Sequence, residues 1–258
     1  MAKRIITKIG DVFCVEFDNG TKGYFQYIAN DLTMMNSTVI RVFKTHYSNN
    51  QPVLIEDIIK DDVDFYAHTI LRSGIANNAW YKIGTSLDLG IKDFATTYFG
   101  YTIPTETIGN KVININPLTN WVIWKYQSEF INIGELPTIY HEKIEFGSIM
   151  PYQCIITRML RGYYTATICE YEILRRKPRP EYKSYVRYKI NDIEYLLCFQ
   201  GDFFEKEIII EEEKVTKITR EEAVINNQDI ARRKFSDTNW KYIDFITEEE
   251  FNQIWNSK

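Results

Sequence analysis

The most informative part of this sequence for the architecture is residues 8–44. It opens with KIGDVFCVEF at residues 8–17 and turns at the Asp-Asn-Gly of residues 18–20. A second extended run, GYFQYIA, covers residues 23–29, and a third, TVIRVF, covers residues 38–43. Asp, Asn and Gly tolerate the positive φ angles of a tight hairpin. The stretch therefore predicts three consecutive antiparallel strands.

Both faces of these strands carry residues that favour burial. In the first strand Phe13, Val15 and Phe17 share one face, because side chains alternate along a strand. Val12 and Cys14 lie on the other face. The second strand has aromatic residues on both faces, which indicates that the sheet is covered on both sides. We expect a strongly curved meander that closes into a barrel-like structure.

This opening resembles the immunity protein twenty-six family of bacterial polymorphic toxin systems. The resemblance rests on KIGDVF at residues 8–13, the aromatic return strand, and IRVF at residues 40–43. It extends more weakly through residues 78–84 and covers about the first two thirds of the chain. The resemblance implies a small β-rich protein that neutralises a cognate toxin by binding it. It implies no catalytic residue and no cofactor.

The composition predicts a folded protein that does not bind nucleic acid nonspecifically. The chain has 258 residues, of which 45% are hydrophobic, enough for one large or two small domains. Its 18 tyrosines and 15 phenylalanines favour strands. The net charge of −4 disfavours nonspecific nucleic-acid binding, which needs a basic face, and permits a basic protein partner.

The cysteines and the hydropathy pattern predict a protein of the reducing cytoplasm. Neither a Cys-x-x-Cys motif nor a Cys/His cluster with zinc spacing occurs, so we expect free thiols and no metal; a disulfide stays open as the alternative. There is no long apolar segment near Met1 and no run of eighteen apolar residues, so we expect neither an export signal nor a membrane span. The four cysteines are Cys14, Cys154, Cys169 and Cys198.

Several shorter patterns predict further elements. Leu54, Ile55, Ile58 and Ile59 recur at helical spacing within residues 52–62. Thr219 and Thr247 each precede a glutamate by three residues, the spacing of a capping box that begins a helix. Helices are expected at residues 151–162 and 247–256, and strands at residues 63–71, 121–126, 130–133, 185–190, 193–199 and 207–211.

An acidic segment follows the meander and is the candidate partner-binding site. Its residues are Glu56, Asp57, Asp61, Asp62 and Asp64. One interpretation is a patch that contacts the toxin. The other is a solvated loop that leads into the next strand.

A basic, proline-containing break divides the chain. Residues 175–181 read RRKPRPE, and the two prolines stop both helices and central strands. We therefore predict a β-rich first domain over residues 1–174, a linker over residues 175–181, and a smaller α+β domain over residues 182–258. The expected fold class is α+β and β-rich, with peripheral helices around the barrel-like meander.

A search for catalytic motifs identifies no site. The chain has no Gly-x-Ser-x-Gly motif and no glycine-rich phosphate loop, and His46, His68 and His141 are far apart in the sequence. Two classes of function remain. The first is a toxin-binding immunity protein that acts on neither nucleic acid nor membrane. The second is a small-ligand-binding domain or an enzyme with an unfamiliar site, which a deep pocket with convergent carboxylates or histidines would favour.

Overall fold

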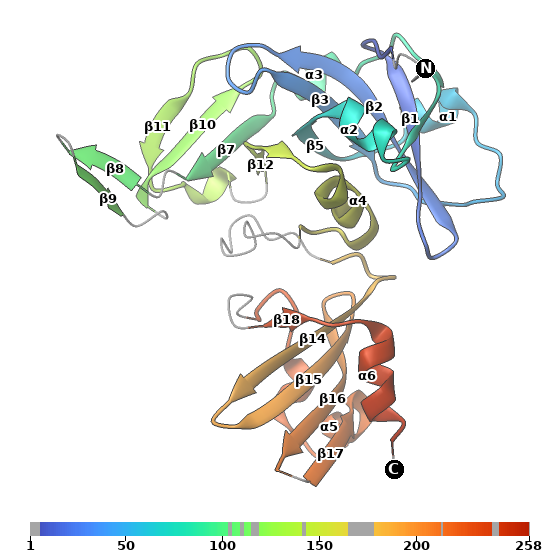
Figure 1. Cartoon of the computed structure of the whole chain (residues 1–258), viewed down its shortest axis with the longest axis vertical. Helices are drawn as coiled ribbons and strands as arrows, with labels where there is room; N and C mark the ends of the chain where they lie inside the picture. Colours follow the sequence, from blue (N-terminus) through green and yellow to red (C-terminus); the bar gives the residue numbers. More distant parts are fainter. Residues whose placement is uncertain are drawn as a thin grey trace. The chain divides into compact units, whose positions relative to one another are not determined.

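The chain forms two compact units, residues Met1–Met159 and Leu160–Lys258 (Figure 1). The computed structural model describes residues 6–102, 105–108, 111–114, 119–140, 143–164, 178–212, 214–238 and 243–257. Each unit has its own sheets and its own apolar core. The two units are therefore described separately.

The first unit is built on a seven-stranded sheet that contains the predicted meander. Its order is β13-β5-β3-β2-β1-β6, and β4 pairs with β2. Neighbours are antiparallel except β13 and β5. The strands are β1 (Asp11–Glu16), β2 (Thr21–Asp31), β3 (Ser37–Phe43), β4 (Tyr47–Ser48), β5 (Val63–Thr69), β6 (Tyr81–Thr85) and β13 (Ile149–Met150).

Both faces of this sheet are covered, as the alternating pattern predicts. On one face Phe13 stacks on Phe25 with ring centroids 5.1 Å apart, and Trp80 meets Phe25 edge-on at 5.0 Å. On the other face Cys14 and Tyr24 belong to a core cluster with the buried residues of helix α1 (Ile55–Lys60). Gly20, at the predicted turn between β1 and β2, has a φ of +82°.

The expected barrel is wrong in one respect, because the sheet is open. It ends at β13 on one side and at β6 on the other, and no sheet in the described part of the chain closes on itself. The physical reason is that a second sheet and short helices cover the far end of the large sheet. Phe94, Phe99 and Trp124 form a core cluster there with Ile28 and Val39 of the large sheet.

The second sheet of this unit has four strands in the order β11-β10-β7-β12. Trp121 and Trp124 of β10 are almost fully buried on opposite faces, so both tryptophans are core residues. The strands are β7 (Tyr98–Thr102), β10 (Trp121–Lys125), β11 (Ile131–Gly134) and β12 (Ile144–Phe146), and a separate hairpin joins β8 (Thr105–Ile108) to β9 (Lys111–Asn114). The helical segments are α2 (Leu71–Ala76), α3 (Ile91–Phe94), η2 (Thr138–Tyr140) and α4 (Tyr152–Arg161).

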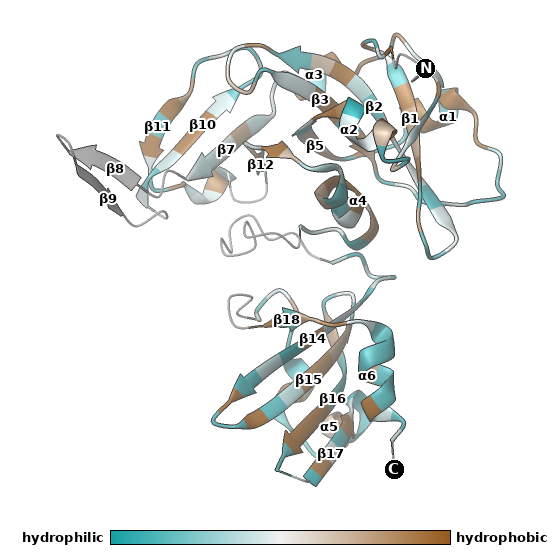
Figure 2. Cartoon of the chain, viewed as in Figure 1, coloured by the Kyte–Doolittle hydropathy of each residue, from teal (hydrophilic) through white to brown (hydrophobic). Residues whose placement is uncertain are grey.

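The second unit is a five-stranded sheet in the order β17-β16-β15-β14-β18, with helices on its two faces. Hydrophobic and hydrophilic residues alternate along these strands (Figure 2). Thr219 and Thr247 both form complete capping boxes at the predicted helix starts. The elements are β14 (Lys183–Ile190), β15 (Ile193–Gln200), β16 (Phe203–Glu211), β17 (Lys214–Thr219), α5 (Arg220–Ile225), η5 (Asp229–Arg232), β18 (Asp244–Phe245) and α6 (Glu248–Trp255).

The predicted α+β, β-rich class is confirmed, with strand residues outnumbering helical ones in the described part of the chain. Helix α2 follows β5 closely, and its Gly74 packs against Trp80. Residues 175–177 of the predicted linker lie outside the described residues. Tyr163, which precedes that linker, belongs to the core of the second unit together with Val186 and Phe235.

Candidate functional site

The acidic segment surrounds helix α1 on the surface of the first unit. Glu56 and Asp57 lie in the first turn of α1, and both are exposed. Acidic residues are favourable there because the helix dipole is positive at that end. Asp62 is exposed after the helix, whereas Asp61 and Asp64 are only partly exposed. The segment thus presents three freely exposed carboxylates.

Asp61 has a structural role that the sequence does not reveal. Its carboxylate accepts hydrogen bonds from the backbone N–H and the hydroxyl of Thr45, both at 2.8 Å. These bonds hold the loop after β3 against the end of α1. Burial, and then the nearby carboxylates of Asp61 and Asp57, raise the pKa of Tyr47 above its usual value. A tyrosine therefore lies beside the acidic segment.

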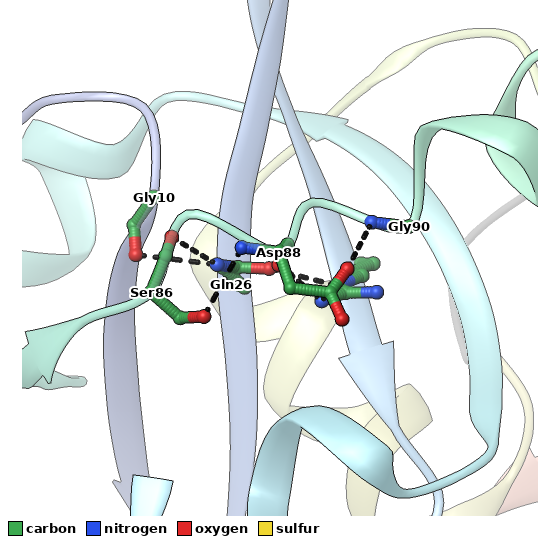
Figure 3. Close-up of polar contacts among 6 residues, drawn as sticks. Gly10, Gln26, Ser86, Asp88 and Gly90 are labelled. Carbon is green, nitrogen blue, oxygen red and sulfur yellow. Dashed lines mark hydrogen bonds and ion pairs between the residues drawn. The ribbon is translucent and has the colours of Figure 1, made fainter. Parts of the chain in front are cut away.

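A second polar cluster lies in the middle of the large sheet, where Gln26 of β2 pairs directly with Arg41 of β3. Both residues are buried. Arg41 Nε donates to Gln26 Oε1 at 2.8 Å. Gln26 Nε2 in turn donates to the backbone oxygens of Gly10 at 3.2 Å and Ser86 at 3.0 Å (Figure 3). The glutamine thus links the guanidinium to the residue that precedes β1 and to the residue that follows β6.

These bonds hold residues 86–90, which we call the pinned loop, over the buried pair. Arg41 Nη2 donates to the backbone oxygen of Asp88 at 2.6 Å and lies 4.0 Å from its Oδ1. Within the loop the N–H of Asp88 donates to Ser86 Oγ, and the N–H of Gly90 donates to Asp88 Oδ1 (Figure 3). Burial lowers the pKa of Arg41, and the nearby charge of Asp88 acts against this. The loop therefore shields a buried cation.

His68 is buried and forms a pair with Asp31 at the far end of the same sheet. Its Nε2 lies 3.0 Å from Asp31 Oδ2, and both side chains are at most 1% exposed. Burial lowers the pKa of His68, and the hydrogen bond to Asp31 offsets part of this. The ring packs against Phe99 with centroids 4.4 Å apart. Both partners belong to the large sheet, and a substrate has no access to them because the His68 ring is covered by Phe99 of the second sheet.

Two further ion pairs, each with a buried carboxylate, also have structural roles. Lys82 Nζ lies 2.7 Å from Asp11 Oδ1 and links β6 to β1. Arg158 Nη1 of α4 lies 3.0 Å from Glu145 Oε2 of β12, and its guanidinium covers the ring of Phe65 at 4.0 Å. Each pair ties neighbouring elements together within the first unit.

The described residues contain no group of three or more His, Cys, Asp and Glu side chains that could hold a metal ion. Cys14, Cys154 and Cys198 are free thiols, while Cys169 and His141 lie outside the described residues. A hollow of about 60 Å³ lies in the second unit beside Tyr185, Cys198 and Glu248. Burial raises the pKa of Cys198 to about 11, so this cysteine is a poor nucleophile at neutral pH.

The Gln26–Arg41 pair and the pinned loop are what the sequence analysis missed. The available signal was polarity inside strands that look buried on both faces. Gln26 lies between Phe25 and Tyr27, and Arg41 lies between Ile40 and Val42. A buried polar residue needs a partner, so two of them in adjacent strands indicate a bonded pair. The loop they hold could not be found in this way.

No helix in the described part of the chain is long and apolar enough to cross a membrane. Comparison with curated proteins finds no match, and comparison with solved structures finds none either. A family model does match, and it spans β1 to the end of β8, including the acidic segment and the pinned loop. The resemblance seen in the sequence is thereby confirmed for about the first 40% of the chain rather than two thirds: residues 8–110 are similar to the Imm26 family, Immunity protein 26.

Proposed function

We propose that this protein is an immunity protein that neutralises a bacterial toxin by binding directly to it. The observation that carries this proposal is the match of residues 8–110 to Immunity protein 26. In this proposal the chain is not an enzyme, and it acts in the cytoplasm on a toxin of the same or a competing bacterium. Three free cysteines are consistent with a reducing compartment.

The chemistry of the first unit supports a binding role. Its buried titratable pairs are enclosed by aromatic and aliphatic residues, whereas three exposed carboxylates lie close together in the sequence in and just after α1. The proposed contact residues are Glu56, Asp57, Asp61, Asp62 and Asp64. A toxin that acts on nucleic acid carries basic residues around its active site, so an acidic surface would speed the encounter by electrostatic steering.

Co-expression with the toxin encoded next to this chain's gene tests the proposal. We expect growth to be restored when this protein is present and the purified pair to form a complex. The control is an unrelated toxin with a similar target, which should remain fully toxic because immunity depends on recognition of one partner.

Full toxicity of the adjacent toxin, in cells that contain abundant folded protein, would reject the immunity function. That outcome would favour a small-ligand-binding domain or an enzyme with an unrecognised site. Growth rescued against both toxins would also contradict direct and specific binding.

A further inference from the structure

The pinned loop carries the most exposed large hydrophobic side chain in the described part of the chain. Leu87 is 91% exposed, although the loop around it is bonded firmly to the sheet. By contrast, Leu89 turns inward and packs on the core cluster that contains Phe94 and Trp124. The loop thus presents one leucine to solvent and uses the other as an anchor.

Further exposed apolar residues lie on the two segments that are bonded or directly joined to the loop. The N–H of Ser86 donates to the backbone oxygen of Gly10 at 2.9 Å, so Ile9 belongs to the segment bonded to the loop. Ile9 is 42% exposed, and Ile91, which follows the loop directly, is 46% exposed. Single exposed apolar residues are ordinary, but three of them on a fixed loop and the segments attached to it are typical of an interaction site.

The backbone of the loop is held before any partner arrives. Gly90 has a φ of +60°, and a Cβ there would lie 2.2 Å from Arg41 Nη1, so the chain passes directly over the guanidinium. Gln26 holds the backbone oxygen of Ser86 and Arg41 holds that of Asp88, so the loop is bonded to the sheet at its start and at its middle. A loop fixed in this way loses little conformational entropy on binding.

Carboxylates border this apolar surface. The side chain of Asp88 is 72% exposed. Helix α1, with exposed Glu56 and Asp57, packs against β6 just before the loop: a Cβ on Gly84 would lie 2.1 Å from Ile55 Cδ1. An apolar centre with an acidic border fits a partner that has an apolar pocket surrounded by basic residues.

We propose that the pinned loop, with Ile9 and Ile91, is the apolar centre of the toxin-binding surface, and that Leu87 enters an apolar pocket on a basic toxin. This inference rests on the proposed function and deepens it. Binding through a buried leucine mainly lengthens the lifetime of the complex, whereas the acidic border mainly changes the rate of association.

The test measures association and dissociation rates of the purified adjacent toxin with four proteins: wild type, Leu87→Ala, Leu87→Asp and Leu32→Asp. Leu32 is the matched control, because it is a leucine of the same unit that is 71% exposed. We expect Leu87→Asp to dissociate at least about tenfold faster, Leu87→Ala to show a smaller effect in the same direction, and Leu32→Asp to behave as wild type.

The outcomes separate this inference from the function on which it rests. If the wild type does not bind the toxin, the proposed function fails. If the wild type binds and Leu87→Asp binds equally well, only the loop assignment is overturned. If Leu32→Asp weakens toxin binding as much as Leu87→Asp does, the loop assignment is also overturned, because the effect would then be nonspecific.

The remaining alternative is that a second copy of this chain covers the loop. Analytical ultracentrifugation of each protein alone tests it. A dimer of the wild type that Leu87→Asp dissociates would show that a second copy covers the loop, and this would overturn the toxin assignment. Unchanged thermal unfolding of the Leu87 variants is expected, because the side chain has almost no contacts to lose.

Discussion

Gln26 and Arg41 face each other across β2 and β3 and share a buried hydrogen bond of 2.8 Å. The other hydrogen bonds of both side chains go to backbone oxygens of Gly10, Ser86 and Asp88. A polar pair in the interior of the sheet therefore fixes the loop that follows β6. Stability of the sheet and order of the loop are coupled through these two residues.

Gln26→Leu is expected to destabilise the first unit by about 2–4 kcal/mol. Leucine keeps the volume but leaves a buried guanidinium N–H without its acceptor, and unsatisfied buried groups cost about 1–3 kcal/mol, or more when charged. Urea unfolding measures the loss in free energy of unfolding. Amide hydrogen exchange should be faster at the N–H of Gly90 in the variant than in the wild type.

Asp88→Asn is the matched control for this experiment. Its side chain is 72% exposed and 4.0 Å from Arg41, so the change should cost less than about 1 kcal/mol. If Asp88→Asn and Gln26→Leu lower the free energy of unfolding equally, Gln26 does not have the specific role of satisfying Arg41.

The local pattern of the sequence predicts the strands well and the site poorly, for physical reasons. Strand alternation and turn residues depend on neighbours, so β1, β2 and β3 and the two capping boxes were predictable. Closure of the sheet depends on what packs over its ends, and the sequence alone did not show that the sheet stays open. The pinned loop depends on contacts between residues as far apart as Arg41 and Asp88.

The stability of the first unit should fall as the pH drops below about 6.5. Burial lowers the pKa of His68 below its ordinary value of 6.5, so the unfolded chain binds the proton first. Neutral His68 therefore contributes its full stability above pH 6.5, and this is lost as the pH falls toward the lowered pKa of the folded state. The slope from one such group is at most about 1.4 kcal/mol per pH unit.

Urea unfolding between pH 7.5 and 5 compares the wild type with His68→Gln. Glutamine keeps a hydrogen-bond donor for Asp31 and cannot titrate in this range, so its curve should be flatter. An identical slope in both proteins would show that His68 is not the group responsible.

The second unit should require residues that precede the predicted linker. Tyr163 is 1% exposed, lies 5.2 Å from Phe235 between ring centroids, and its hydroxyl is 2.8 Å from Ser184 Oγ. A fragment of residues 160–258 should therefore unfold at a higher temperature than one of residues 182–258. Tyr163→Ala in the longer fragment should remove about 3–5 kcal/mol, the usual cost of deleting a large aromatic side chain from a core.

The result also bears on our proposal of two modules joined at residues 175–181. If the shorter fragment is as stable as the longer one, the second module begins at residue 182, as the sequence predicts. Cleavage by a protease at low concentration, mapped by mass spectrometry, locates the accessible connection independently.

Reversing the exposed carboxylates of the acidic segment should slow association with the toxin and leave the fold intact. The variant is Glu56→Lys, Asp57→Lys and Asp62→Lys together. Asp61 is kept, because its bonds to Thr45 would otherwise be lost. We expect about a tenfold slower association at low salt, and a weaker dependence on salt than in the wild type, because steering acts through charges that salt screens.

The matched control places the same change of net charge on the second unit. Asp192, Glu211 and Asp237 are all exposed, and reversing them to lysine alters total charge equally. Association of this control should stay close to wild type, since steering depends on charge near the contact surface. If both triple variants slow association equally, the rate depends on net charge alone. That result would contradict the acidic segment as a contact site.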